Sequence, residues 1–288
     1  MVTLSSTDSF LAAIASARSV QLSAYFLHPG RVLDALAAAA RRGTQLRVRV
    51  EASSYGGDPD AMFRMSARAV GQLHKLGADA QLVGPGATAP LLHGKLAVVD
   101  GVLYADDRNW AQADTIVTDT SARDVRAASD AIAGRADPPS KSFATMKGDA
   151  IQLESRLLAG AHSGAPVVVE SETFGGGAIS VQLDRLGRAG VHPRLLVSAR
   201  PLQERPAERT TLARLAADGV EVRVCSADDK FAVVGSAAWI GSANATFTSQ
   251  RTPTFDWGLR TSAGGIGTTL RTEFERRWSR AKPLPRTQ

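Results

Sequence analysis

The 288-residue sequence contains a single cysteine, Cys225, so it has no internal disulfide and no thiolate metal cluster. This absence excludes the disulfide-scaffold and zinc-ribbon classes together. No stretch approaches the roughly 20 apolar residues that a membrane span needs. The N-terminal segment lacks the basic start and apolar core of a secretory signal, so we expect a cytoplasmic protein with no integral membrane association.

Acidic residues are fewer than basic ones, with 28 Asp and Glu against 34 Lys and Arg, which gives a net charge of +6. This balance favours anionic partners such as nucleic acid or acidic lipid. Aromatic residues make up only 6% of the chain, so there are few surfaces on which bases could stack. The remaining composition, 44% hydrophobic and 22% charged, is that of a folded globular protein.

The sequence contains an internal repeat of one α/β unit. An alternating apolar segment from Ser19, a helical pattern that ends at Gly43 and a strand-like segment from Gln45 recur in the same order from Pro166, to Gly190 and from Pro193. Strands that alternate with helices indicate α/β architecture, so we expect two repeats, each a mixed sheet flanked by helices, packed as a pseudo-dimer. We predict the first repeat over residues 1–136, a linker over 137–149 that is rich in turn formers, and the second repeat over 150–288.

Each half carries a related motif at an offset of 135 residues. The first is His93-x-Lys95 with Asp100 after four more residues, and alternate residues of a strand share a face, so the histidine and the lysine can address one phosphate. Lys95 matches Lys230, and Asn109 matches Asn244. One such motif would arise often by chance, whereas two copies in matched α/β contexts are informative.

With these motifs the sequence resembles the phospholipase D superfamily, whose members carry two H-x-K-x4-D motifs, each followed by Gly-Ser-x-Asn. The resemblance covers nearly the whole chain and implies a metal-independent phosphodiester reaction in which a motif histidine attacks phosphorus and forms a phosphohistidine. His93 is then the nucleophile, and the family's orienting carboxylate matches Asp256 of the segment FDWG. The two motif lysines and two asparagines would stabilise charge on phosphorus.

The second motif departs from the family pattern. Asp228 stands where the family has its second histidine, which would protonate the leaving group, and Gly235 stands where the family has aspartate. In the first half Asp106 and Asp107 replace Gly-Ser and add negative charge, while Ser242 of the second half remains for a phosphate hydrogen bond. Since motif aspartates have structural roles in the family, we expect Gly235 to affect local order more than chemistry.

Asp228 is either a remnant of decay or a substitute proton donor. An ordinary carboxylic acid is ionised at neutral pH and cannot donate a proton. Asp114 lies near the family position that would orient the missing second histidine, and two neighbouring carboxylates, together with burial, would raise one of the two pKa values. The hypothesis of a protonated Asp228 follows from this pairing.

The function expected from the sequence is a phospholipase D-like phosphodiesterase. It would cleave or transfer phosphodiesters and act on nucleic acid, without cofactor or metal. The other histidines, at 28, 74, 162 and 192, show no ligand spacing. One alternative is a phospholipid hydrolase or phosphatidyltransferase, for which Ala89, Pro90, Leu91 and Leu92 would supply an apolar rim. A second alternative is an inactive phosphate-binding descendant. We expect a monomer, with a homodimer as the alternative.

Overall fold

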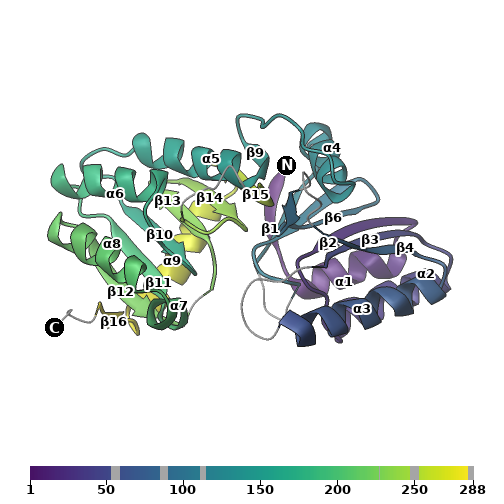
Figure 1. Ribbon diagram of the computed structural model, residues 1–288. Coiled ribbons are helices and arrows are strands. Elements are labelled where there is room, and N and C mark those ends of the chain that lie inside the picture. Colours follow the sequence, from purple (N-terminus) through teal and green to yellow (C-terminus); the bar gives the residue numbers. More distant parts are fainter. Residues whose placement is uncertain (53–58, 85–89, 111–114, 227, 247–252, 285–288) are drawn as a thin grey trace. The chain divides into compact units, whose positions relative to one another are not determined.

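The computed structural model describes residues 1–52, 59–84, 90–110, 115–226, 228–246 and 253–284, and it divides into two compact units. Unit 1 comprises residues 1–140, 144–147 and 250–257, and unit 2 comprises residues 141–143, 148–249 and 258–288. Each unit is a mixed sheet with helices on its faces, so the expected fold class of two α/β repeats is confirmed (Figure 1). None of the described helices combines the length and the apolar character that crossing a membrane requires.

The sheet of unit 1 has seven strands in the order β1-β8-β7-β6-β2-β3-β4. Among the described residues of this sheet, only the β2–β3 and β3–β4 pairs are parallel. The strands are β1 (Val2–Ser5), β2 (Ser19–Ala24), β3 (Gln45–Glu51), β4 (Asp79–Val83), β6 (Lys95–Val99), β7 (Val102–Asp106) and β8 (Ile116–Asp119). A short strand, β5 (Leu91–Leu92), pairs with residues 254 and 255 at the start of β15 (Thr254–Thr261).

The helices of unit 1 cover both faces of its sheet. Three of them lie on one face: α1 (Thr7–Ser16), α2 (Arg31–Arg41) and α3 (Pro59–Lys75). The fourth, α4 (Ala122–Ile132), contacts β2, β6 and β7 on the other face (Figure 1). Apolar side chains of α1 to α3 and of alternate strand positions form the core, including Phe10, Leu22, Leu36, Val48 and Leu73.

Unit 2 repeats this topology. Its strands run in the order β16-β12-β11-β10-β13-β14-β15. Among the pairs described between these seven strands, β10–β11 and β11–β12 are parallel and the others antiparallel. The strands are β10 (Val167–Ser171), β11 (Arg194–Ser198), β12 (Glu221–Cys225), β13 (Phe231–Val234), β14 (Ala237–Gly241), the second half of β15, and β16 (Lys282–Pro283). The helices are α5 (Lys147–Ala159), α6 (Ala178–Arg188), α7 (Ala199–Glu204), α8 (Pro206–Ala217) and α9 (Ile266–Trp278).

Matched signals end the equivalent helices. Arg41 and Arg188 lie in the last turns of α2 and α6, and Gly43 and Gly190 follow with φ of 82° and 71°. A left-handed backbone at this place accepts glycine without steric cost, which is why the chain leaves each helix here. The segment predicted as the linker, 137–149, contains β9 (Phe143–Met146), which pairs with β15, and the first residues of α5.

Candidate active site

His93 lies between β5 and β6, where three contacts fix the backbone around it. Its N–H donates to the carbonyl of Phe255 at 3.0 Å. The N–H of Leu92 donates to Glu51 Oε2 at 2.7 Å, and the Ser23 hydroxyl donates to the carbonyl of Gly94 at 3.1 Å. Buried polar contacts of this kind hold a short segment in one conformation. The histidine is therefore positioned by β2, β3 and β15 of unit 1.

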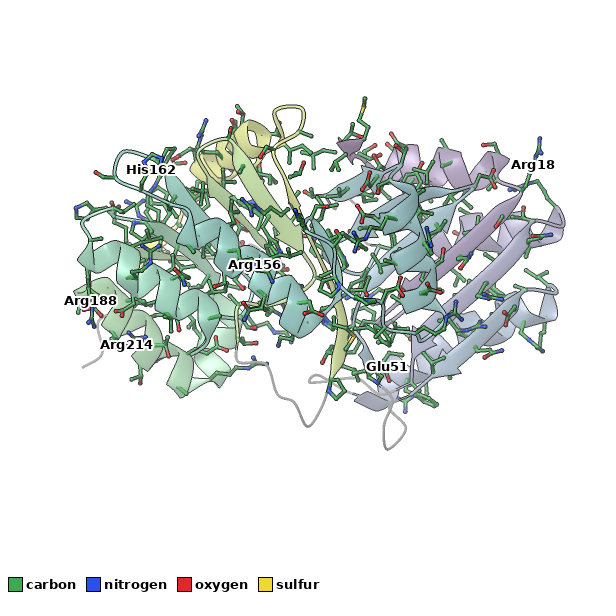
Figure 2. All side chains as sticks on the ribbon, turned by 90° about the horizontal axis from the view of Figure 1, so that it is seen from above. Arg18, Glu51, Arg156, His162, Arg188 and Arg214 are labelled. Atoms are coloured by element: carbon green, nitrogen blue, oxygen red, sulfur yellow. The ribbon has the colours of Figure 1, made fainter. Side chains whose placement is uncertain are left out.

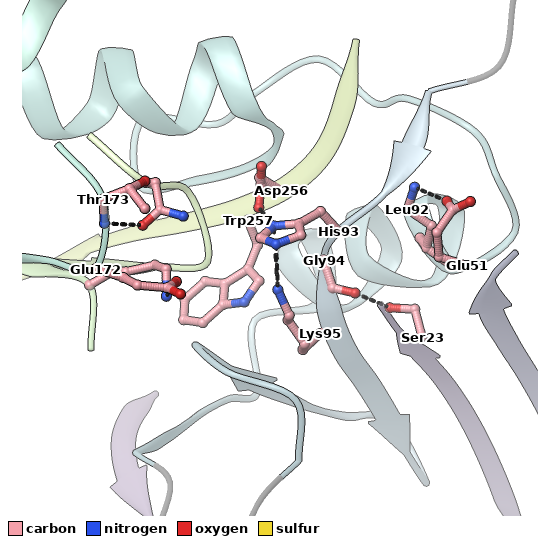
Figure 3. A network of polar contacts seen from close by, with 12 residues as sticks. Ser23, Glu51, Leu92, His93, Gly94, Lys95, Glu172, Thr173, Asp256 and Trp257 are labelled. Carbon is pink, nitrogen blue, oxygen red and sulfur yellow. Dashed lines mark hydrogen bonds and ion pairs between the residues drawn. The ribbon is translucent and has the colours of Figure 1, made fainter. Parts of the chain in front are cut away.

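The imidazole of His93 is oriented by Asp256. Nδ1 lies 2.7 Å from Asp256 Oδ1, and because a carboxylate accepts hydrogen bonds, Nδ1 is the donor (Figure 3). Asp256 is 3% exposed and the histidine side chain 20% exposed. A proton held on Nδ1 leaves the lone pair on Nε2, the nitrogen that can attack.

Lys95, two residues on, has its ammonium beside the same ring. Its Nζ lies 3.2 Å from Nε2 of His93 and 5.7 Å from the ring centroid of Tyr25, and the lysine is 2% exposed. The Tyr25 ring meets the His93 ring edge-on at a centroid distance of 4.8 Å. A buried cation of this kind is stabilised by an anion. The arrangement therefore suits a phosphate oxygen placed next to Nε2.

The equivalent lysine of unit 2 has different neighbours. Lys230 is 3% exposed, and its Nζ contacts Glu172 Oε2 at 3.0 Å and the backbone carbonyl of Asp228 at 2.9 Å. Strand register shows which residue of unit 1 matches Glu172. Val99 and Val234 are equivalent motif positions, and they pair with Val20 and Val167 in the two sheets. Five residues after these two valines come Tyr25 and Glu172, which are therefore counterparts. The repeat therefore has an aromatic ring beside one lysine and a carboxylate beside the other.

Asn244 is anchored in unit 2 by its oxygen. Oδ1 accepts a hydrogen bond from the N–H of Thr173 at 3.1 Å. Since the oxygen is used as an acceptor, the amide NH2 is the part that can donate to an anion. Ser242, for which a phosphate contact was predicted, has 0% exposure.

Solved structures with a similar architecture are known. A phosphatidylserine synthase from Haemophilus influenzae matches 98% of this chain and 87% of its own chain at 12% identity, with a TM-score of 0.66. A polyphosphate kinase from Porphyromonas gingivalis matches 96% of this chain at 15% identity, with a TM-score of 0.64, and this chain spans 46% of its length. Both are phospholipase D superfamily members. The chain has the phospholipase D fold. No protein-family model and no curated protein matches it by sequence.

Within the phospholipase D fold of unit 1, Asp106 has a structural partner. Its Oδ2 accepts a hydrogen bond from the N–H of Trp110 at 2.6 Å, and its carbonyl accepts one from Nε1 of Trp257 at 2.8 Å. Asp106 and Asp107 are 0% and 1% exposed. The two aspartates that follow the first motif are therefore buried, and the carboxylate of Asp106 accepts the hydrogen bond of the Trp110 amide.

Motif residue Asp100 also acts on the backbone. Its carboxylate accepts from the N–H groups of Arg18 and Ser19 at 3.1 and 2.8 Å, at the opposite end of β6 from Lys95. Asp100 has φ of 47°, and Gly235, its counterpart in unit 2, has φ of 60°. By register Pro166 stands where unit 1 has Ser19, and proline has no N–H for a carboxylate to accept. Unit 2 therefore lacks both the motif aspartate, replaced by Gly235, and one of the backbone N–H groups that it would bind, at Pro166.

Asp228 does not have the surroundings that the sequence hypothesis invoked. Its side chain is exposed, so the burial expected to favour a protonated carboxyl is not found. Asp114, its expected partner, lies outside the described residues. The apolar rim suggested for lipid is also not found in the described part, because Leu91 and Leu92 are 2% and 5% exposed and belong to β5, while Ala89 lies outside that part.

Sequence reasoning missed three residues of these sites: Tyr25, Glu51 and Glu172. Glu51 is the one acidic residue in the strand pattern QLRVRVE, and a charge at the end of an apolar strand was a usable signal. Tyr25 and Glu172 follow β2 and β10 directly, where side chains of neighbouring strands converge. Asn109 follows β7 in unit 1 and lines a pocket together with the loop after β2, residues 27–32.

Proposed function

We propose that the protein cleaves or transfers phosphodiesters through a covalent phosphohistidine on His93. The observation that carries this proposal is the Asp256–His93 hydrogen bond through Nδ1, with the Lys95 ammonium 3.2 Å from Nε2 of the same ring. A nucleophile, its orienting carboxylate and a cation for the developing charge are the groups that such a reaction needs. The phospholipase D fold supports the same class of chemistry.

In the first step Nε2 of His93 attacks phosphorus, and the bond from phosphorus to the leaving oxygen breaks. The leaving oxygen carries away the electron pair of that bond and takes up a proton from Asp228 or from water. In the second step water, or an acceptor alcohol, attacks the phosphohistidine and restores the imidazole. Lys95 turns its N–H groups from the ring to the nonbridging oxygens. On the strength of the repeat, we assign phosphate contacts also to Asn109, Lys230 and Asn244, whereas Ser242 has no exposed surface for such a contact.

We propose nucleic acid as the substrate, supported by the net charge of +6. Lysine and arginine side chains that bind backbone phosphates release the counterions condensed on the nucleic acid, so the affinity falls steeply with salt. Fluorescence anisotropy of a labelled single strand across a salt series tests this assignment. Binding that is absent at low salt, together with turnover of a phospholipid, would transfer the assignment to lipid. The likeness to a phosphatidylserine synthase over 98% of this chain makes phosphatidyl transfer the second candidate.

The direct test of activity uses bis(4-nitrophenyl) phosphate in the presence of a chelator. Wild-type protein is expected to hydrolyse it, and His93→Ala to lose the activity by several orders of magnitude, because the nucleophile is gone. His162→Ala is the matched control, since His162 is exposed and its Nδ1 lies 3.0 Å from a backbone carbonyl (Figure 2). An unchanged rate in His93→Ala, or chelator inhibition that added metal reverses, would overturn the proposal. No turnover of any phosphodiester by wild-type protein would leave a phosphate-binding descendant.

A further inference from the structure

Glu172 places a carboxylate against Lys230, the motif lysine of unit 2. Its Oε2 lies 3.0 Å from the ammonium, and the glutamate side chain is 40% exposed, whereas the lysine side chain is 3% exposed. The carboxylate is thus the solvent-accessible partner of a buried cation. A phosphate that binds the ammonium of Lys230 comes close to the negative charge of Glu172.

The backbone on both sides of Glu172 is fixed to the segment that carries Asn244. The N–H of Thr173 donates to Asn244 Oδ1 at 3.1 Å. The hydroxyl of Ser171 accepts from the N–H of Ala245 at 3.1 Å. These hydrogen bonds hold Glu172 between its two neighbours, so its carboxylate stays close to the motif lysine and to the residue that carries the donating amide.

Unit 1 has an uncharged ring at the equivalent position. Tyr25, the counterpart of Glu172, is 6% exposed, and its ring centroid lies 5.7 Å from Nζ of Lys95. A tyrosine is neutral at pH 7 and 8, because its ordinary pKa is about 10. The repeat therefore accepts a neutral side chain beside the motif lysine, and the carboxylate is a feature of unit 2.

The second motif adds further negative charge near Lys230. Its ammonium donates to the backbone carbonyl of Asp228 at 2.9 Å, and the side chain of Asp228 is an exposed carboxylate. The carboxylate of Asp229 is paired with the guanidinium of Arg277. Glu172 and Asp228 therefore outweigh the single positive charge of Lys230, and of these two carboxylates Glu172 contacts the ammonium.

The charge of the ligand decides how strongly it is affected by this carboxylate. A phosphodiester carries one negative charge, whereas a phosphomonoester carries about two above its second pKa of about 6. Coulomb energy is proportional to the ligand charge, so a lysine alone attracts the monoester more strongly than the diester. A carboxylate beside that lysine repels the monoester more strongly too, and it cancels this advantage.

We propose that Glu172 is a specificity-determining residue, which makes the phosphate site accept monoanionic phosphodiesters and discriminate against dianionic phosphomonoesters. The inference rests on the proposed function, in which Lys230 and Asn244 contact the phosphate. Attack of water on the phosphohistidine yields a phosphomonoester. Glu172 therefore also limits inhibition of the protein by the product of hydrolysis.

Isothermal titration of the His93→Ala protein tests the proposal, because this variant keeps both motif lysines and lacks the nucleophile. The probes are bis(4-nitrophenyl) phosphate and 4-nitrophenyl phosphate, at pH 8 and low salt. Adding Glu172→Gln should tighten binding of the monoester about tenfold and of the diester about threefold, because removal of one charge acts twice as strongly on a dianion. Glu221→Gln is the matched control, since it removes the same charge from an exposed position at the start of β12.

Tyr25→Glu in the same background is the converse variant, since it places a carboxylate beside Lys95. It should weaken binding of the monoester about tenfold and of the diester about threefold, in protein whose thermal unfolding shows it to be folded. The proposal is overturned if neither probe binds, or if the ratio of the two dissociation constants in Glu172→Gln stays within twofold of that in Glu221→Gln.

Hydrolysis of bis(4-nitrophenyl) phosphate by the protein with His93 intact separates the two proposals. Turnover together with an unchanged ratio in Glu172→Gln would refute the role of Glu172 and leave the reaction. A changed ratio without any turnover would refute the reaction and leave Glu172 as the residue that selects between singly and doubly charged phosphate esters.

Discussion

His93 and Asp256 are 163 residues apart in the chain and 2.7 Å apart in space. The Asp256→Asn variant keeps the size of the side chain but cannot hold a proton on Nδ1 in the same way. We expect kcat on bis(4-nitrophenyl) phosphate to fall about 10²- to 10⁴-fold with little change in KM, because the wrong tautomer removes the lone pair from Nε2. Steady-state kinetics measures this, and a kcat within twofold of wild type would contradict the role of Asp256.

Asp228 distinguishes an enzyme that has replaced its second histidine by another proton donor from one that has lost this donor. If its carboxyl protonates the leaving oxygen, Asp228→Asn should slow an alkyl phosphodiester strongly and a 4-nitrophenyl ester weakly, since the better leaving group needs little protonation. The ratio of the two kcat/KM values is the measurement. Equal slowing of both esters would indicate a structural role, and no effect on either would exclude Asp228 from the reaction.

At the scale of single residues, the sequence predicts the motif groups but not their neighbours. His93 and Lys95 follow from alternation along a strand, and Asp256 from the family resemblance. The alignment of Ser19 with Pro166 already matches Tyr25 with Glu172, at an offset of 147 residues. It does not show that either side chain lies beside a motif lysine, because the motifs repeat at a different offset, 135 residues, and only the folded sheet brings the two segments together.

At the scale of elements, the two units cap one equivalent amide by different means. In unit 1 Asp106 accepts from the N–H of Trp110 at 2.6 Å, and in unit 2 Ser171 accepts from the N–H of Ala245 at 3.1 Å. By register the counterpart of Ser171 is Ala24, which cannot accept. From the sequence, Asp106 could be described only as a replacement of the family's Gly-Ser. Its role could not be predicted, because the Trp110 N–H comes within reach of the carboxylate only in the folded turn.

This difference between the units predicts that a second substitution can restore stability lost at Asp106. Asp106→Gly leaves the buried Trp110 N–H without its acceptor and should lower the free energy of unfolding by about 1–3 kcal/mol. Adding Ala24→Ser, which recreates the arrangement of unit 2, should recover part of that loss. Urea unfolding of the single and double variants measures both effects. A double variant no more stable than Asp106→Gly alone would show that the two caps are not equivalent.

Most element boundaries follow from patterns that the sequence displays. The helix before Gly43 and the strand from Gln45 are predicted by periodicity and by the C-terminal glycine. Helix α1 was not predicted, although Ser6 is an N-cap that accepts from the Ser9 N–H at 3.2 Å. Strand β9 falls in a segment of turn formers, and it forms because β15 offers a partner, which is a long-range contact that local composition does not show.

At the scale of the whole molecule, stability should depend on two buried glutamates of unit 2. Burial raises the pKa of Glu154 to about 8, and burial, opposed by Arg277, raises that of Glu170 to about 8. A carboxyl whose pKa is higher in the folded state holds its proton better there than in the unfolded chain. The stability contribution is therefore complete below about pH 4.5 and is lost as pH rises toward about 8.

The Glu154→Gln variant tests this dependence, since glutamine resembles the protonated acid and does not titrate. We expect the variant to have a melting temperature close to wild type at pH 5 and a higher one at pH 8.5, measured by thermal unfolding across that range. Glu221→Gln serves as the control, because Glu221 is exposed. Equal melting temperatures of Glu154→Gln and wild type at pH 8.5 would show that Glu154 does not titrate in this range.

The phosphohistidine itself is the most direct test of the reaction. Wild-type protein mixed with bis(4-nitrophenyl) phosphate and chelator, then quenched rapidly in alkali where phosphohistidine survives, should carry one 4-nitrophenyl phosphoryl group. Peptide mass spectrometry should place that group on His93. His93→Ala should carry none, and His162→Ala should carry as much as wild type. Turnover with no modified histidine, or modification at a residue other than His93, would contradict the mechanism.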